Sequence, residues 1–450
     1  MRRRQPVRPV LSLIVLLVLI ATACTQGPTD TSPADSGTTA ETTSETTGEV
    51  QTTVITETTG ADTTAPPETT PATETTVSAG GALTFGMVLV GPENDHGWSQ
   101  AHFEAGQYVE EQLGASMISL DTVNPADRPE TSVEQVVEDM VSQGAQLVFA
   151  TSDDMKDGIL AAAAANPDVP MIWSSGDSAW EEGQDYRPNL TNLGNVMGRM
   201  EYGKMIAGCA AALTTQTGQI GYLGPLINDE TRRLVNSAYL GARHCWEGAG
   251  NDPADLSFTV NWIGFWFNIP GQTLDPTQVT NEFFDSGADV VISGIDTTEA
   301  VVRAGQRFAA DEAVWAVPYD FEGACEEAPA ACLGVPYFNW GPAYLEIAQS
   351  VVDGTFEAGF EWNAPDWSDI NNPDTSAVGW INGEGLSPEA ATDVEAFIGT
   401  LADGSANLFT GPLNFQDGSV FLEDGDEATD TQIWYMPQLL EGMVGASSSE

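Results

Sequence analysis

The sequence has little positive charge. Its 450 residues include 14 Lys and Arg against 66 Asp and Glu, which gives a formal net charge of −52. Lysine occurs only at Lys156 and Lys204. Such a chain repels the phosphate backbone of nucleic acids and anionic lipid surfaces, so we expect no nucleic-acid partner. The excess of acidic residues accounts for solubility and needs no further functional reading.

Motifs of common exported enzymes are also missing. The chain has no Gly-x-Ser-x-Gly elbow, no His-Glu-x-x-His pattern and no phosphate-binding loop, and it contains only 3 histidines. None of the 5 cysteines has zinc-type spacing. We therefore predict no metal, no cofactor and no enzymatic activity. Paired carboxylates could still do acid–base work, so an exported enzyme remains the less favoured alternative.

No apolar run after the first residues is long enough to cross a bilayer. Residues 1–23 have a basic start followed by a short apolar stretch, which is typical of a secretory signal peptide. Small residues then precede Cys24 as in a bacterial lipobox, and a lipid on Cys24 would anchor the chain to the outer face of the membrane. Ordinary cleavage that leaves Cys24 free is the alternative. Residues 24–81, rich in Thr, Ser, Glu and Pro, are predicted to form a disordered tether.

The rest of the chain alternates short apolar strands with helical patterns of ten to fifteen residues. This alternation predicts an α/β fold with parallel, doubly wound sheets. Two such series, joined by strand-like crossings, indicate two lobes with a hinge and a cleft between them. We assign 82–193 plus 337–365 to lobe 1, 194–336 plus 366–442 to lobe 2, and 443–450 to a tail. A hairpin cover is expected near residues 409–418.

Four cysteines fall in the predicted folded part, and an exported protein lives where disulfides persist. Cys325 and Cys332 flank a short loop, whereas Cys209 and Cys245 end successive predicted helices. We favour the pairs Cys209–Cys245 and Cys325–Cys332, although spacing alone leaves the other two connectivities open.

Aromatic and polar side chains follow several of the predicted strands. Because the carboxyl ends of parallel strands line the ligand crevice of open α/β sheets, these side chains are candidates for ligand binding. They are Asp95, Trp98, His102, Ser152 and Asp153 in lobe 1, Trp266, Asp296 and Asp320 in lobe 2, and Asn339 and Trp340 at a crossing. Helix capping is the alternative role for Asp95 and Asp153, and loop packing for Trp98.

Segments spread over most of the folded part resemble one protein family. They are Gly91-Pro92, Gly97-Trp98, Phe149-Ala150-Thr151-Ser152, Ile206-Ala207-Gly208, Leu240-Gly241-Ala242-Arg243, Trp262-Ile263-Gly264-Phe265-Trp266, Asn339-Trp340-Gly341-Pro342 and Phe409-Thr410-Gly411-Pro412. In order and spacing they are similar to the BMP (basic membrane protein) family of type I periplasmic binding proteins. The resemblance implies a monomeric lipoprotein that closes around a purine nucleoside or base and delivers it to an ABC permease. It also places Trp98 at the position of the family's stacking aromatic residue.

One loop departs from the nucleoside receptors of that family. It has Asp95-His96-Gly97-Trp98-Ser99 where they have Asp-x-Ser-Phe-Asn, and no lysine lies near Trp340 in sequence. A free base, another small ring or a sugar therefore remains open as the ligand. A receptor that senses its ligand for a membrane kinase also remains open beside transport.

Overall fold

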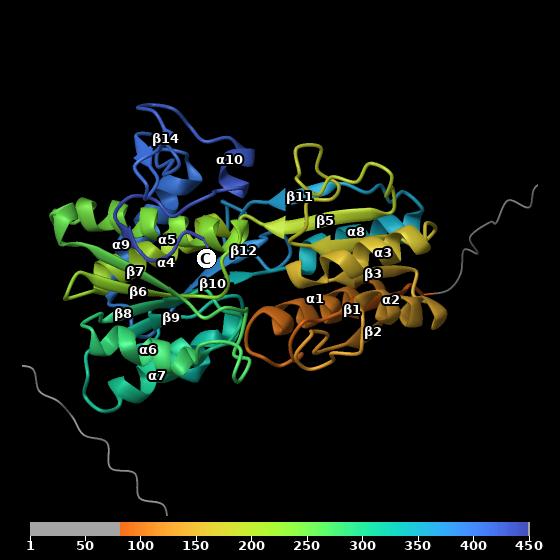
Figure 1. Ribbon diagram of the computed structural model, residues 1–450, viewed down its shortest axis with the longest axis horizontal. Helices are drawn as coiled ribbons and strands as arrows, with labels where there is room; N and C mark the ends of the chain where they lie inside the picture. Colours follow the sequence, from red (N-terminus) through yellow and green to blue (C-terminus); the bar gives the residue numbers. More distant parts are fainter. Residues whose placement is uncertain (1–81, 449–450) are drawn as a thin grey trace, which may run out of the picture. The chain divides into compact units, whose positions relative to one another are not determined.

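The computed structural model describes residues 82–448 (Figure 1). The predictions for the signal peptide, for Cys24 and for the tether concern residues outside this range. Across the described residues, none of the helices combines the length and the apolar character needed to span a bilayer.

The sheet of lobe 1 has six parallel strands in the order β11-β5-β4-β3-β1-β2. They are β1 (Thr84–Val88), β2 (Ser116–Leu120), β3 (Leu147–Ala150), β4 (Met171–Ser174), β5 (Leu193–Gly198) and β11 (Phe360–Asn363). The β1 strand pairs with both β2 and β3: Val88 lies opposite Leu120 on one side and opposite Ala150 on the other. The β3 and β4 strands are buried along their whole length, as expected for strands covered on both faces.

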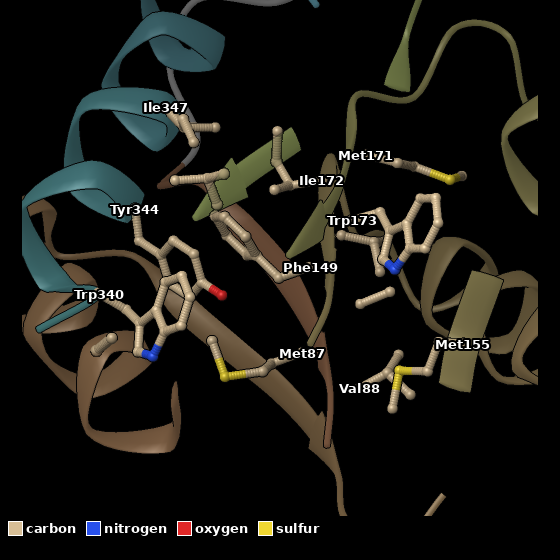
Figure 2. Packing of buried hydrophobic residues seen from close by; sticks show 14 of the residues in the cluster. Met87, Val88, Phe149, Met155, Met171, Ile172, Trp173, Trp340, Tyr344 and Ile347 are labelled. Atoms are coloured by element: carbon tan, nitrogen blue, oxygen red, sulfur yellow. The ribbon is translucent and has the colours of Figure 1, made fainter. Parts of the chain in front are cut away.

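Helices cover both faces of this sheet. They are α1 (Trp98–Leu113), α2 (Val133–Ser142), α3 (Lys156–Ala165) and α8 (Gly341–Asp353). The α1 and α8 helices pack together, and so do α2 and α3. Figure 2 shows Trp340, which directly precedes α8, and Tyr344 of α8 beside Phe149 and Met87 of the sheet. A helix that begins at residue 341 thus completes the core of a lobe that begins at residue 82.

The sheet of lobe 2 has five parallel strands in the order β15-β7-β6-β8-β9. They are β6 (Gln219–Gly224), β7 (Ser257–Trp262), β8 (Val290–Ser293), β9 (Trp315–Val317) and β15 (Met443–Val444). Its helices are α4 (Met200–Thr214), α5 (Asp229–Gly248), α6 (Pro276–Asp285), α7 (Glu299–Phe308), α9 (Pro388–Ala402) and α10 (Asp430–Trp434). Figure 1 shows α4 and α5 on one face of this sheet and α6 and α7 on the other.

The chain passes between the lobes at three places, after β5, after β10 (Gly334–Phe338) and after β11. The third passage leads into β12 (Val378–Asn382), which pairs antiparallel with β10 and forms a small sheet at the crossing. The prediction of two parallel, doubly wound α/β lobes is confirmed. A hairpin of β13 (Leu413–Asn414) and β14 (Val420–Leu422) lies near the expected position and packs on the core of lobe 2.

Two expected boundaries differ from the structure. The division at residue 193 falls inside β5, all of which is buried in the lobe 1 sheet, so lobe 1 continues to Gly198. The tail expected at 443–450 contributes β15, which pairs with β7 at the edge of the lobe 2 sheet.

Both favoured disulfides are present in the structure. Cys209 of α4 is bonded to Cys245 of α5 with Cα atoms 5.1 Å apart, and Cys325 is bonded to Cys332 with Cα atoms 5.5 Å apart. The first bond joins two helices that lie on the same face of the lobe 2 sheet (Figure 1).

Candidate ligand-binding cleft

A pocket lies where the carboxyl ends of the strands of both lobes face each other. Its lining consists of Trp98, Ser152, Asp153 and Ser175 from lobe 1, and of Tyr222, Pro225, Glu230, Thr231, Leu234, Trp266, Gly294, Asp296 and Tyr319 from lobe 2. The empty space measures about 410 Å³ with the solvent at its mouth included, but the centre of a water molecule reaches only about 20 Å³ of it. A purine ring would therefore enter only when side chains turn or the lobes part.

Contacts across this pocket hold the lobes close together. The Asn228 side-chain amide, just before α5, donates to the Asp153 carboxylate at 3.4 Å. At the rim, His96 Nδ1 lies 2.6 Å from the Glu327 carboxylate. The main chains approach most tightly at Gly97, where an added Cβ atom would lie 1.7 Å from the carbonyl oxygen of Asp296. Only glycine fits at Gly97 in this arrangement of the lobes.

One indole on each side of the pocket supplies a flat apolar surface. The Trp98 ring is fixed from behind, because its Nε1 donates to the Thr151 carbonyl oxygen at 2.6 Å and its edge packs against Trp340 at 5.4 Å between ring centroids. Trp266 belongs to the loop after β7 and is 8% exposed. The Trp266 carbonyl oxygen accepts a hydrogen bond from the Asp296 amide at 2.9 Å. This bond connects the loop that carries the indole to the loop that carries the Asp296 carboxyl group.

Three carboxyl groups, those of Asp153, Glu230 and Asp296, line the pocket beside several hydroxyl groups. Burial raises the pKa of Asp153 to about 6, although the ammonium group of Lys156 opposes the shift. Burial likewise raises the pKa of Glu230 to about 7, opposed by the Arg233 guanidinium. The pKa of Asp296 is raised well above its usual value by burial and then by the nearby Asp320 carboxylate. Buried acids of this kind favour a ligand that donates several hydrogen bonds, because each donor offsets a desolvation cost.

Asp320, expected in the cleft, lies behind its wall instead. It is fully buried, its φ is 74°, and neither carboxylate oxygen has a hydrogen-bond partner among residues 82–448. Burial raises its pKa well above the usual value, and the ammonium of Lys204 opposes that shift. Burial lowers the pKa of Lys204 to about 7, and its Nζ donates to the Ser293 carbonyl oxygen at 2.7 Å and lies 3.2 Å from the centre of the Tyr319 ring. Lys204 therefore lies directly behind Tyr319, which lines the pocket, and is the cation closest to the buried Asp320 among the groups that influence its pKa.

Asp95 caps a helix. Its carboxylate accepts from the amides of Gly97, Ser99 and Gln100 at 2.9 to 3.0 Å, in the first turn of α1. Unpaired amides at a helix start need such an acceptor, so these bonds give the carboxylate a capping role. The side chain does not line the pocket, and the capping alternative describes its position.

His102 and Trp340 lie under Trp98 in the core of lobe 1. The His102 ring stacks on Trp340 at 4.2 Å, and its Nδ1 is 2.7 Å from the Tyr344 hydroxyl. That hydroxyl also lies 2.8 Å from Ser174 Oγ. Burial lowers the pKa of His102 well below its usual value, which favours the neutral ring. Neither His102 nor Trp340 lines the pocket; both fix the ring that does.

Asn339 holds the segment in which the chain passes between the lobes for the third time. Its side-chain amide donates to the carbonyl oxygens of Pro373 and Ser376, both at 2.9 Å. These bonds hold the segment that leads into β12, so the position of Asn339 is that of a hinge residue rather than a wall of the pocket.

Several lining residues were not predicted. The most polar are Ser175, Tyr222, Glu230, Thr231 and Tyr319. Ser175 directly follows β4 and carries a positive φ of 67°, so the strand-end rule could have found it. Tyr222 lies inside β6, and Glu230 and Thr231 lie in the first turn of α5; no sequence pattern separates them from core and helix-start residues.

A two-lobed α/β protein with its pocket between the facing strand ends has the architecture of a solute-binding protein. The chain belongs to the Bmp family, described as ABC transporter substrate-binding protein PnrA-like, whose model matches residues 82–364. The resemblance inferred from the sequence is therefore confirmed. The family consists of extracytoplasmic binding proteins that work with ABC permeases, not of enzymes.

Relatives and solved structures agree with this assignment. The chain is 27% identical over 361 residues to a purine-binding protein of Brucella abortus, covering 80% of this chain and 93% of that protein. It is 29% identical over 292 residues to a protein of Haloferax volcanii named as an ABC transporter glucose-binding protein, covering 63% and 65% of the two chains.

Among solved structures, a solute-binding protein of an Aeropyrum pernix ABC transporter matches with a TM-score of 0.56 at 12% identity, covering 74% of this chain and 93% of that one. One from Conexibacter woesei matches with a TM-score of 0.51 at 18% identity, covering 72% and 98%. At these identities the likeness shows the fold alone, which is that of type I periplasmic binding proteins.

Proposed function

We propose that this protein captures a purine base or purine nucleoside between its lobes and delivers it to an ABC importer. The observation that carries the proposal is that Trp98 and Trp266, one from each lobe, line a pocket that also contains the carboxyl groups of Asp153, Glu230 and Asp296. Indole faces suit a flat heteroaromatic ring, and carboxylates accept from ring N–H, amino and ribose hydroxyl groups. The purine-binding relative from Brucella abortus supports the same ligand class.

A sugar is the second candidate. The pocket's acidic groups Asp153, Glu230 and Asp296 also suit a ligand rich in hydroxyl groups, and an indole face commonly packs against a sugar ring. The glucose-binding name of the Haloferax volcanii relative agrees with that chemistry. In this alternative one indole would suffice, whereas a purine would use both.

Calorimetric titration separates these ligands. The protein would be titrated with adenine, adenosine, guanosine and inosine, and in parallel with glucose and a panel of other sugars. We expect binding of at least one purine with a negative heat-capacity change, because apolar surface is buried between the lobes. Sugar binding without any purine binding would refute the proposal, and turnover of any ligand would favour an enzyme.

We further propose that Cys24 carries the lipid anchor and that residues 24–81 link it to the lobes. Support comes from the small residues before Cys24 and from the extracytoplasmic role of the family. Mass spectrometry of the mature N-terminus tests this directly: a diacylated Cys24 is expected, and a mature chain that begins elsewhere would contradict it. A neighbouring permease gene would favour transport over sensing.

A further inference from the structure

The segment Asp430–Leu440, which we call the C-terminal strap, contacts both lobes and the hinge. It begins with α10 and lies beyond residue 364, where the match to the family model ends. In Figure 1, α10 lies close to the end of β11, one of the strands from which the chain passes between the lobes. Its contacts therefore bear on the angle between the lobes.

On one side the strap is fixed to α5 of lobe 2. Arg232 Nε donates to the Met436 carbonyl oxygen at 2.7 Å. The Asn236 amide donates to the Gln438 carbonyl oxygen at 2.9 Å, while its side-chain oxygen accepts from the Leu440 amide at 2.9 Å. Asn236 is completely buried, so its side chain aligns the strap on the helix as one unit.

On the other side the strap reaches the loop of residues 177–192, which follows β4 of lobe 1. The Tyr435 hydroxyl donates to the Asp177 carboxylate and accepts from the Gln184 amide at 2.7 Å. Thr431 donates to the Glu182 carboxylate. Burial, and then the bond to Asp177, raises the pKa of Tyr435, so its hydroxyl keeps its proton and remains a donor.

This loop moves with lobe 1 because the lobe holds it at several points. Asn195 of β5 accepts from the Ala179 amide at 2.6 Å. The Trp180 ring stacks on Phe360 of β11 at 4.7 Å, and Lys156 of α3 forms an ion pair with Asp185. A bond from the strap to this loop is consequently a bond between the lobes.

The strap also touches the first passage of the chain between the lobes. Asp430 forms an ion pair of 2.7 Å with Arg199, the residue that links β5 to α4. The Arg199 guanidinium lies 4.0 Å from the centre of the Trp362 ring, and Trp434 packs edge-on against Trp362 at 4.8 Å. Rotation of the lobes would shear these contacts together with those of Tyr435 and Thr431.

We propose that the C-terminal strap is a latch that holds the lobes at the closed angle and thereby raises the affinity for the ligand. A receptor that is closed only part of the time binds with an affinity reduced by that fraction, so a latch removes part of the cost of closing. Bonds to carboxylate acceptors are among the stronger ones, and loss of one is expected to shift the closing equilibrium on the order of tenfold.

The test removes the Tyr435 hydroxyl and measures the distance between the lobes. Cysteines introduced at the exposed Gln107 of α1 and Gln278 of α6 carry spin labels, in the full chain with Cys24→Ser. The other cysteines are paired in disulfides. The variants are Tyr435→Phe and, on the surface, Glu182→Ala. Tyr186→Phe is the matched control, because its hydroxyl lies in the same loop and has no hydrogen-bond partner within residues 82–448.

In ligand-free protein, Tyr435→Phe and Glu182→Ala should populate longer distances that the wild type and Tyr186→Phe lack. Identical distributions in all four proteins, or an equal shift in Tyr186→Phe, would overturn the latch. If Tyr435→Phe does not fold, Glu182→Ala decides alone. With adenine as the probe, the latch predicts a dissociation constant about tenfold higher in Tyr435→Phe. If adenine does not bind the wild type, the purine assignment is at fault, and the label distances still decide on the latch.

Discussion

The main chains of the two lobes meet at Gly97 and Asp296, where an added Cβ atom would lie 1.7 Å from the Asp296 carbonyl oxygen. Gly97 belongs to the first loop of lobe 1, and Asp296 follows β8 of lobe 2. Because the two residues belong to different lobes, parting of the lobes would break this contact. The requirement for glycine at position 97 follows from this contact, because any added Cβ atom would overlap the Asp296 carbonyl oxygen.

We therefore expect Gly97→Ala to fold normally and to close incompletely. Ligand affinity in calorimetry should fall by at least about tenfold, because Trp98 of lobe 1 and Trp266 of lobe 2 could no longer contact the ligand at the same time. The control is Gly399→Ala in α9, where an added Cβ atom meets nothing within 4 Å. If Gly97→Ala binds as tightly as the control, the closed contact is not part of the liganded state.

Trp266 offers the sharper test of the aromatic wall. Trp98 also supports the core through Trp340 and Phe338, so its removal would mix stability with binding. Truncation of Trp266 in Trp266→Ala should weaken purine binding on the order of 10- to 100-fold, because a large apolar face is lost from the ring. Phe265→Ala is the matched control, since Phe265 is the neighbouring aromatic residue and does not line the pocket. Equal losses in both variants would argue against stacking on Trp266.

Sequence reasoning located the residues whose position follows from a strand end. Trp98, Asp153, Trp266 and Asp296 line the pocket because each lies in the segment that follows a parallel strand, namely β1, β3, β7 and β8. Helical periodicity could not show that His102 faces inward beneath Trp98, because a histidine on an amphipathic helix fits either face.

The lobe boundary expected at residue 193 falls inside β5 because the sequence around this strand contains asparagines. Asn192 and Asn195 are typical of loops, yet both are buried here. The Asn192 amide donates to the carbonyl oxygens of Ala163, Asn166 and Val169, and the Asn195 amide donates to that of Trp173. These partners lie far enough along the chain that only the folded structure brings them together.

The hydroxyl of Tyr344 tests whether His102 is structural. It is fully buried and links His102 to Ser174. In Tyr344→Phe both partners lose a buried hydrogen bond, so the free energy of unfolding in urea should fall by about 1–3 kcal/mol. Ligand affinity should stay within about twofold, because none of the three side chains lines the pocket. Unchanged stability with lost affinity would instead make His102 a ligand-binding group. The surface change Tyr186→Phe controls for loss of a tyrosine hydroxyl.

The acid lining the pocket at Glu230 predicts a pH dependence of stability. Burial raises its pKa from 4.5 to about 7 in the folded protein, so between these values the folded state binds more protons than the unfolded state. The stability that this proton contributes is fully present below pH 4.5 and is lost as the pH rises through about 7.

Glutamine resembles the protonated acid at every pH. The melting temperatures of the wild type and of Glu230→Gln should therefore agree near pH 4.5, and the variant should melt a few degrees higher near pH 8. Comparing the two proteins removes the contribution of all other titrating groups. Glu389→Gln, at the exposed start of α9, is the control and should show no such divergence. If the difference between the two melting temperatures is the same from pH 4.5 to pH 8, Glu230 is ionised in the folded protein over this range. The ligand would then meet a negatively charged carboxylate at this position instead of a protonated carboxyl group.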